Sequence, residues 1–161
     1  MMKDDLKMTV IGSVQSNTNG AVIAISDAWI EGLVGLAGFT HAHILWLADH
    51  ERGDCILTCP APYTSSADDI GVFASRSPFR PSPIGLSTIR ITAVDVQAGL
   101  IETPYIDACV GTKILDIKPY FPSTDRVGSA LIPAHFSHWP GTLEASAEFD
   151  WASEFREPEN A

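Results

Sequence analysis

Two arginines in a proline-rich loop are the residues of this sequence best suited to chemistry. Arg76 and Arg80 lie within residues 71–87, a stretch that also contains three prolines. Proline fixes its own φ and pushes the preceding residue towards extended geometry, so few conformations are open to such a loop. A guanidinium group binds carboxylates, phosphates and aromatic faces, and a stiff loop loses less entropy when it holds a ligand. The stretch predicts a ligand-binding loop, and the alternative is a surface turn whose arginines pair with acidic residues.

Three histidines form a second group that could do chemistry. His41 and His43 lie in a strand predicted over residues 39–50, and alternation places both on one face of it. Imidazoles with this spacing can chelate a metal, with His50 as a third ligand, and the protein would then be a metal-dependent hydrolase. No Asp or Glu follows at a telling spacing, so structural hydrogen bonds are the favoured interpretation and we expect no metal.

Composition limits the class of protein. The chain has 161 residues, 45% of them hydrophobic and 19% charged, which is typical of one globular domain. The net charge of −10 argues against a general nucleic-acid-binding surface, although a local basic patch in the second half is compatible with it. The three cysteines are expected to be buried, reduced thiols. The sequence starts without the apolar segment of a signal peptide and has no membrane-spanning run, so we expect a cytoplasmic protein that does not enter a membrane.

The elements that must position these residues are mostly strands. Alternating apolar residues and turn signals predict strands over residues 8–14, 21–25, 39–50, 55–58, 70–75, 84–96, 100–107 and 112–120. A short helix is expected over residues 28–36, capped by Ser26 or Asp27. This pattern predicts a mainly β fold, a small closed antiparallel β-barrel with one or two short helices. Residues 127–161 form a C-terminal extension, with a helix or an arm over residues 144–155, which packs on the barrel or on a dimer partner.

Two long motifs resemble the signatures of one known family. Residues 76–87 read Arg-Ser-Pro-Phe-Arg-Pro-Ser-Pro-Ile-Gly-Leu-Ser, and residues 111–122 read Gly-Thr-Lys-Ile-Leu-Asp-Ile-Lys-Pro-Tyr-Phe-Pro. Both resemble the TsaA-like, or TrmO, family of S-adenosylmethionine-dependent methyltransferases, and residues 38–41 are similar to a third, weaker signature. The likeness extends from about residue 9 to residue 126. It implies a TsaA-like β-barrel domain over residues 1–126 that forms a homodimer and binds S-adenosylmethionine without a Rossmann sheet.

The resemblance also implies a reaction. It is N-methylation of the threonylcarbamoyl-modified adenosine beside the anticodon of tRNA, or methylation of a smaller nucleophilic substrate. A different class of function is a non-catalytic module that binds S-adenosylmethionine and signals its level to a partner. The chain differs from the family pattern at Lys113, which replaces a proline, at Val110 and Ser82, and at residues 16–20, where the family has Pro-Arg-Gln.

The residues of the expected site follow from the same resemblance. Arg76, Asp49 and His50 are the expected catalytic residues, the last two as acceptors of a proton. The cofactor contacts it implies are Arg76, Leu86, Asp49, His50, Asp107, Cys109, Val110 and Gly111. The substrate contacts or pocket walls are Arg80, His41, Asp116, Lys118 and Tyr120. For Asp116 and Lys118 the alternative is an exposed ion pair with each other.

Overall fold

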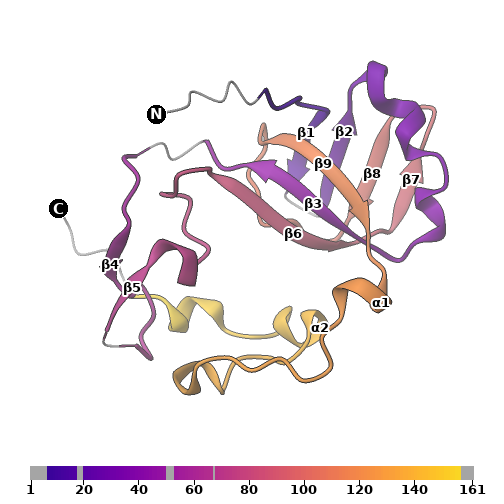
Figure 1. The fold of residues 1–161 in the computed structure, drawn as a ribbon. Helices are drawn as coiled ribbons and strands as arrows, with labels where there is room; N and C mark the ends of the chain where they lie inside the picture. Colours follow the sequence, from indigo (N-terminus) through magenta and orange to yellow (C-terminus); the bar gives the residue numbers. More distant parts are fainter. Residues whose placement is uncertain (1–6, 18–19, 50–52, 67, 157–161) are drawn as a thin grey trace. The chain divides into compact units, whose positions relative to one another are not determined.

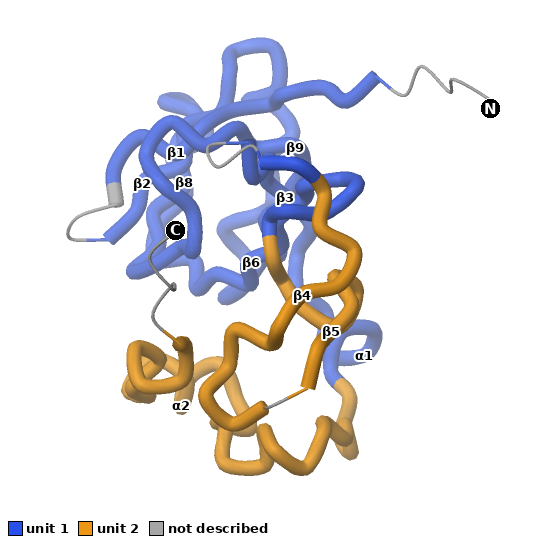
Figure 2. The backbone as a smooth tube through the Cα atoms, turned by 90° about the vertical axis from the view of Figure 1, so that its left-hand side faces the viewer, with its two compact units in different colours: residues 1–54, 78–126 blue, residues 55–77, 127–161 orange. Residues whose placement is uncertain are grey.

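The computed structural model describes residues 7–17, 20–49, 53–66 and 68–156, which belong to two compact units (Figure 2). The first, which we call the sheet unit, comprises residues 1–54 and 78–126. The second, the aromatic unit, comprises residues 55–77 and 127–161. Nearly all the predicted site residues therefore fall in the sheet unit, whereas Arg76 belongs to the aromatic unit.

The sheet unit is built around one antiparallel sheet of seven strands (Figure 1). Its strands are β1 (Gly12–Asn17), β2 (Ala21–Ile25), β3 (His41–Leu47), β6 (Ile84–Arg90), β7 (Ala93–Asp95), β8 (Leu100–Thr103) and β9 (Lys113–Pro119). They lie in the order β6-β3-β9-β1-β2-β8-β7. The mainly β fold is confirmed. Among the described residues no ladder joins β6 to β7, so closure into a barrel stays a prediction.

Alternation along β3 determines which face of the sheet is core. Ala42 and Ile44 are fully buried, whereas His41 and His43 lie on the opposite, half-buried face. The predicted faces of this strand are confirmed. Isoleucines of the neighbouring strands, such as Ile114 of β9, complete the core, because β-branched side chains pack well on a pleated surface.

The expected helix over residues 28–36 is present in a different form. The segment forms two 3₁₀-helices, η1 (Asp27–Leu33) and η2 (Leu36–Gly38). Gly35 lies between them with a left-handed φ of 89°, a conformation that ends the first helix and that glycine adopts without steric cost. Leu33 and Leu36 are buried, whereas Trp29 is 47% exposed. The last helix of this unit is α1 (Pro122–Asp125).

The aromatic unit has little regular structure. It contains β4 (Thr58–Pro60), β5 (Asp69–Gly71), η3 (Val72–Ala74), η4 (Ala134–Phe136), α2 (Leu143–Ser146) and η5 (Trp151–Glu154). The predicted closing helix over residues 144–155 is therefore two short pieces, α2 and η5. No helix of the described residues is long and apolar enough to cross a membrane.

Aromatic rings supply the core of this second unit. Tyr63 contacts Phe136, Trp139 and Phe155, with ring centroids 5.0, 5.4 and 5.6 Å away. Glu154, which is 7% exposed, accepts hydrogen bonds from Trp139 Nε1 at 2.8 Å and from His138 Nε2 at 2.9 Å. The rings of Phe136 and Trp139 meet Tyr63 edge to face, an arrangement that stabilises the packing of a small aromatic core. Whether the unit packs on the sheet or on a dimer partner stays a prediction.

Candidate functional site

Three strand ends meet at one edge of the sheet unit. The final residue of β3, Leu47, pairs with Ile84 at the start of β6. On its other side β3 pairs with β9, where Trp46 lies opposite Ile114. Because the strands are antiparallel, the end of β3 lies beside the starts of β6 and β9, and Asp49 follows two residues after Leu47. The structure thus places Asp49 next to the two strand starts that carry the family signatures.

Asp49 forms an ion pair at this edge. Lys113 Nζ donates to Asp49 Oδ2 at 2.6 Å, and the two side chains are 50% and 15% exposed. Lys113 is the first residue of β9 and pairs with Ser13 of β1 on its far side. Nothing in the sequence signalled this contact, because the two residues are 64 positions apart. His50, the other predicted proton acceptor, lies outside the described residues.

The turn before β9 is located at the same edge. Gly111 has a φ of 86° and donates its N–H to Val14 O at 2.8 Å, which attaches the turn to β1. Cys109 and Val110 are exposed beside it. Leu86 of β6 is 48% exposed, so the edge also has an apolar surface. The structure therefore brings Asp49, Leu86 and the turn close to one set of strand ends.

Asp107 begins this turn and has a partner. Its carboxylate accepts a hydrogen bond from the hydroxyl of Tyr105. Partial burial raises the pKa of Tyr105, and the negative charge of Asp107 raises it further. A phenol that remains protonated can keep donating to this carboxylate. The cysteines are all free thiols, but the prediction that they are buried was wrong, because Cys55 and Cys109 are exposed.

The proline-rich loop is tightly turned, as its sequence predicted. Arg80 donates its N–H to Pro78 O at 2.8 Å and Ile84 donates to Ser82 O at 2.7 Å, both across only two residues. The ring of Phe79 lies against Gly53, so closely that a Cβ at that position would approach its Cε1 to 2.8 Å. Arg80 is thus carried by a stiff turn anchored on an aromatic ring.

Arg76 is described with the aromatic unit. There its positive charge lowers the pKa of Tyr63, although the larger effect of burial raises that pKa overall. The flanking Ser77 donates its N–H to Ser75 Oγ at 3.3 Å, which orders the backbone around the arginine. The role that the family resemblance gives to Arg76 stays a prediction.

A polar cluster occupies the solvent-facing side of β3. Tyr120 lies against both histidines, with ring centroids 6.3 Å from His41 and 5.5 Å from His43. His43 Nδ1 is 2.9 Å from Thr88 Oγ1, and its Nε2 is 3.5 Å from the carboxylate of Asp125. The structure therefore brings His41 and Tyr120 together, as expected for one binding surface. It adds His43 and Asp125, and no spacing in the sequence identified the latter.

Asp116 and Lys118 are paired with each other. Lys118 Nζ lies 2.8 Å from Asp116 Oδ2, and the hydrogen bond that the lysine donates to this carboxylate raises the pKa of the lysine. The exposed ion pair considered as their alternative role is confirmed. An ion pair does not exclude a contact with substrate, which stays a prediction.

The described residues do not support a metal centre. No group of three His, Cys, Asp or Glu side chains among them is arranged to hold an ion. His41 and His43 instead interact with Thr40, Thr88 and Asp125. The hydrolase alternative has no support in this part of the chain.

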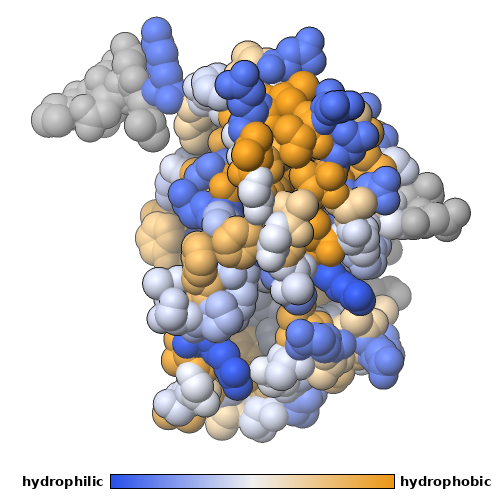
Figure 3. Space-filling model, turned by 90° about the vertical axis from the view of Figure 1, so that its right-hand side faces the viewer, coloured by the Kyte–Doolittle hydropathy of each residue, from blue (hydrophilic) through white to orange (hydrophobic). Residues whose placement is uncertain are grey.

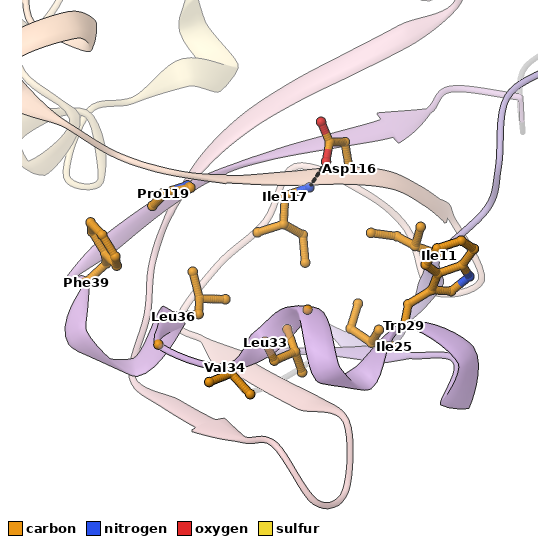
Figure 4. A pocket seen from close by; sticks show the side chains of 12 residues that line it. Ile11, Ile25, Trp29, Leu33, Val34, Leu36, Phe39, Asp116, Ile117 and Pro119 are labelled. Carbon is orange, nitrogen blue, oxygen red and sulfur yellow. Dashed lines mark hydrogen bonds between the residues drawn. The ribbon is translucent and has the colours of Figure 1, made fainter.

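An apolar pocket of about 480 Å³ lies elsewhere in the sheet unit. It is lined by η1, η2 and the strands beneath them, and the side chains of Leu33, Leu36 and Ile117 point into it (Figure 4). The carboxylate of Asp116 points away from it, on the other side of β9 (Figure 4). Apolar side chains gather on the surface over this segment (Figure 3), where Val34 is 74% exposed. Among the described residues that line the pocket Asp116 is the only charged one, and because its carboxylate points away the pocket suits an apolar ligand better than a polar one.

Comparison with known proteins agrees with the signatures. The family described as the tRNA-methyltransferase O N-terminal domain matches residues 7–126. An S-adenosyl-L-methionine-binding protein of Archaeoglobus fulgidus is 34% identical over 105 residues, which cover 65% of this chain and 72% of the relative. A human tRNA (adenine(37)-N6)-methyltransferase is 37% identical over 123 residues, which cover 71% of this chain and 27% of the relative.

A solved structure shows the same fold. The crystal structure of TrmO from Pseudomonas aeruginosa superposes with a TM-score of 0.62 at 26% identity, covering 78% of this chain and 60% of that one. The chain therefore spans well under two thirds of the human relative and somewhat under two thirds of this solved chain. Because the family match covers most of the chain and follows both signatures, this protein belongs to the family of the tRNA-methyltransferase O N-terminal domain.

Proposed function

We propose that this chain is an S-adenosylmethionine-dependent methyltransferase that acts on tRNA. The observation that carries the proposal is the meeting of Asp49, Leu86 and the turn at Gly111 at one edge of the sheet, in a chain that belongs to the family of the tRNA-methyltransferase O N-terminal domain. The names of two relatives, a binder of S-adenosylmethionine and a tRNA adenine N6-methyltransferase, support the donor and the acceptor.

The residues at this edge fit the cofactor chemically. S-adenosylmethionine supplies a methyl group on a sulfonium, together with an amino-acid zwitterion and a nucleoside. Opposite charges are present in Asp49 and Lys113, and an exposed apolar side chain in Leu86. The left-handed Gly111 keeps the adjoining turn free of a side chain, so a ligand can approach the backbone there. These residues would hold the cofactor.

The main task of the protein residues is alignment. Orientation of donor and acceptor can lower a barrier by about 7–11 kcal/mol, so a strong base is not required. The nitrogen of the acceptor must still lose one proton after its bond to carbon forms. Asp49 or Asp107 can take that proton, directly or through water, because both are carboxylates at the strand-end edge.

We infer that the acceptor is adenosine beside the anticodon, carrying the threonylcarbamoyl group. The cluster of His41, Tyr120 and His43 supports this, since aromatic rings with hydrogen-bonding atoms suit a base and its polar substituent. Arg80 on its stiff turn is suited to a phosphate or to the threonyl carboxylate.

The test is transfer of a deuterated methyl group to tRNA, followed by mass spectrometry of the digested nucleosides. Two substrates and one control are compared: tRNA with the threonylcarbamoyl group, the same tRNA without it, and modified tRNA in a reaction lacking enzyme. Labelled methyl on the modified adenosine alone is the expected result. Saturable cofactor binding with no transfer to any tRNA would contradict the proposal and indicate a binding module.

We also propose that the protein works as a homodimer, which the family resemblance implies. The exposed apolar side chains of Trp29 and Val34 support a contact between two copies at the surface formed by η1 and the residue that follows it. Light scattering after gel filtration should give twice the mass of the chain. Val34→Glu should shift the mass towards that of one chain, and a wild-type protein of single mass would refute the dimer.

A further inference from the structure

The ion pair between Asp49 and Lys113 has no evident structural task. The ladder between β3 and β9 already fixes these strand ends, because Trp46 pairs with Ile114 one residue from Lys113. An ion pair with one half-exposed partner contributes only about 0–1 kcal/mol to stability. Lys113 is 50% exposed, so its ammonium can leave the pair at little cost.

The pair offers two opposite charges within one hydrogen-bond distance. Its oxygen and nitrogen lie 2.6 Å apart at the edge where the cofactor contacts meet. An α-amino acid carries an ammonium and a carboxylate on the same α-carbon. The two sets of charges are therefore complementary: a carboxylate can accept from the ligand ammonium, and a lysine can donate to the ligand carboxylate. Neither protein charge is left without a partner in such a complex.

We propose that Lys113 selects the amino-acid end of the donor by binding its α-carboxylate, while Asp49 binds its α-ammonium. The proposal rests on the proposed function, since it concerns the same edge and the same cofactor. Lys113 is one of the positions at which the chain differs from the family signature, so this contact is a property of the present sequence. With Asp49 bound to the α-ammonium of the donor, Asp107 is the carboxylate left to accept the proton from the acceptor nitrogen.

The experiment measures the affinity of two ligands by calorimetry. S-adenosylhomocysteine and 5′-methylthioadenosine share the nucleoside and the thioether, but only the first carries the amino-acid group. The variants are Lys113→Met, Lys113→Arg and Asp49→Asn. Lys118→Met is the matched control for affinity, because Lys118 is an exposed lysine on the same strand that also pairs with a carboxylate, at 2.8 Å.

The expected result is selective. Lys113→Met lowers the affinity for S-adenosylhomocysteine about tenfold, in line with the loss of one charge-assisted hydrogen bond at a half-exposed site. It changes the affinity for methylthioadenosine less than twofold. Lys113→Arg keeps most of the affinity, and Lys118→Met changes neither ligand. Circular dichroism spectra and melting curves identify any variant that fails to fold. If only Lys113→Met fails to fold, the other two variants still test the proposal. Asp49→Asn should weaken the binding of S-adenosylhomocysteine but not of methylthioadenosine, and Lys113→Arg should keep most of the affinity for both.

Two results would overturn the inference alone: equal losses for both ligands, or no loss for either. If the absence of any loss in Lys113→Met came with slower methyl transfer to tRNA, the lysine would contact the acceptor instead of the donor. If the wild type binds neither ligand nor S-adenosylmethionine, the proposed function itself fails, and that outcome is distinct from the others.

Discussion

Gly85 in β6 is the residue whose substitution is most sensitive to the packing beside the proposed site. A Cβ built on Gly85 would overlap the indole ring of Trp46, the residue opposite it on β3. The indole cannot move freely, because Trp46 Nε1 donates to Ser87 Oγ at 3.0 Å and its ring packs against the core. Without this neighbour, alanine would stabilise the strand by roughly 0.5–1 kcal/mol relative to glycine. The clash therefore decides the sign of the effect.

The magnitude follows from two contributions. Forcing a methyl group into a packed site costs about 1–3 kcal/mol, and loss of the indole hydrogen bond costs about 0.5–1.5 kcal/mol. After the gain of alanine over glycine is subtracted, Gly85→Ala should therefore lower the free energy of unfolding of the sheet unit by about 1–4 kcal/mol. In a protein of this size, each kcal/mol corresponds to a decrease of about 2–4 °C in the melting temperature. Melting followed by circular dichroism measures the change.

Two further variants test the reasoning. Gly32→Ala is the control, because a Cβ built there meets nothing within 4 Å outside its own helix, so this variant should be as stable as the wild type or more stable by up to about 1 kcal/mol. Trp46→Leu removes the indole, so the added methyl group should cost much less in that background. A Gly85→Ala protein as stable as the wild type would refute this account of the packing. Fully additive effects of Gly85→Ala and Trp46→Leu in the protein that carries both would also refute it.

Three more predictions concern charge and ligands. Hydrogen bonds from Trp139 and then His138 hold the pKa of Glu154 below its ordinary value. Because this pKa is lowered in the folded state, the ionised carboxylate stabilises the fold at pH values above the unfolded pKa of about 4.3. This stabilisation is lost as the pH falls through the pKa of the folded state. Urea unfolding should therefore show the aromatic unit weakening below about pH 4, with a smaller dependence in Glu154→Gln; equal dependence would contradict it. Arg76→Ala should weaken S-adenosylmethionine binding or slow transfer to tRNA by tenfold or more, about 1.4 kcal/mol, and an unchanged variant would remove Arg76 from the site. Prolonged treatment with a chelator should leave the affinity for S-adenosylmethionine unchanged, because no metal is expected at this site, and a loss restored by one metal would reopen the hydrolase interpretation.

Local patterns predicted the strands well where both faces had a distinct environment. β2 has the bounds expected from its turn and its alternation, and the two faces of β3 are as predicted. The predicted strand over residues 70–75 is shorter, because the chain turns into η3 at Val72. Periodicity shows which side of an element is apolar, but it does not show at which residue a strand stops pairing with its neighbour.

The contacts that sequence reasoning missed join distant positions. Asp49 and Lys113 are 64 residues apart, and the bridge between Tyr63 and Phe155 joins the two segments of the aromatic unit. The sequence showed the type of each residue but not its partner, since ion pairs and ring contacts depend on the folded chain. The family resemblance directed attention to strand ends that the structure brings together at one edge of the sheet. It could not indicate a role for Lys113, because the family has a proline at this position.

The location of the donor is tested most directly by nuclear magnetic resonance of the labelled protein during titration with S-adenosylmethionine. Backbone amide signals of Asp49, Leu86, Val110 and Gly111 should shift in a saturable manner, whereas those of Leu33 and Leu36 at the apolar pocket should not. Saturable shifts confined to the pocket, or no shifts at all, would contradict the assignment of the cofactor to the strand-end edge.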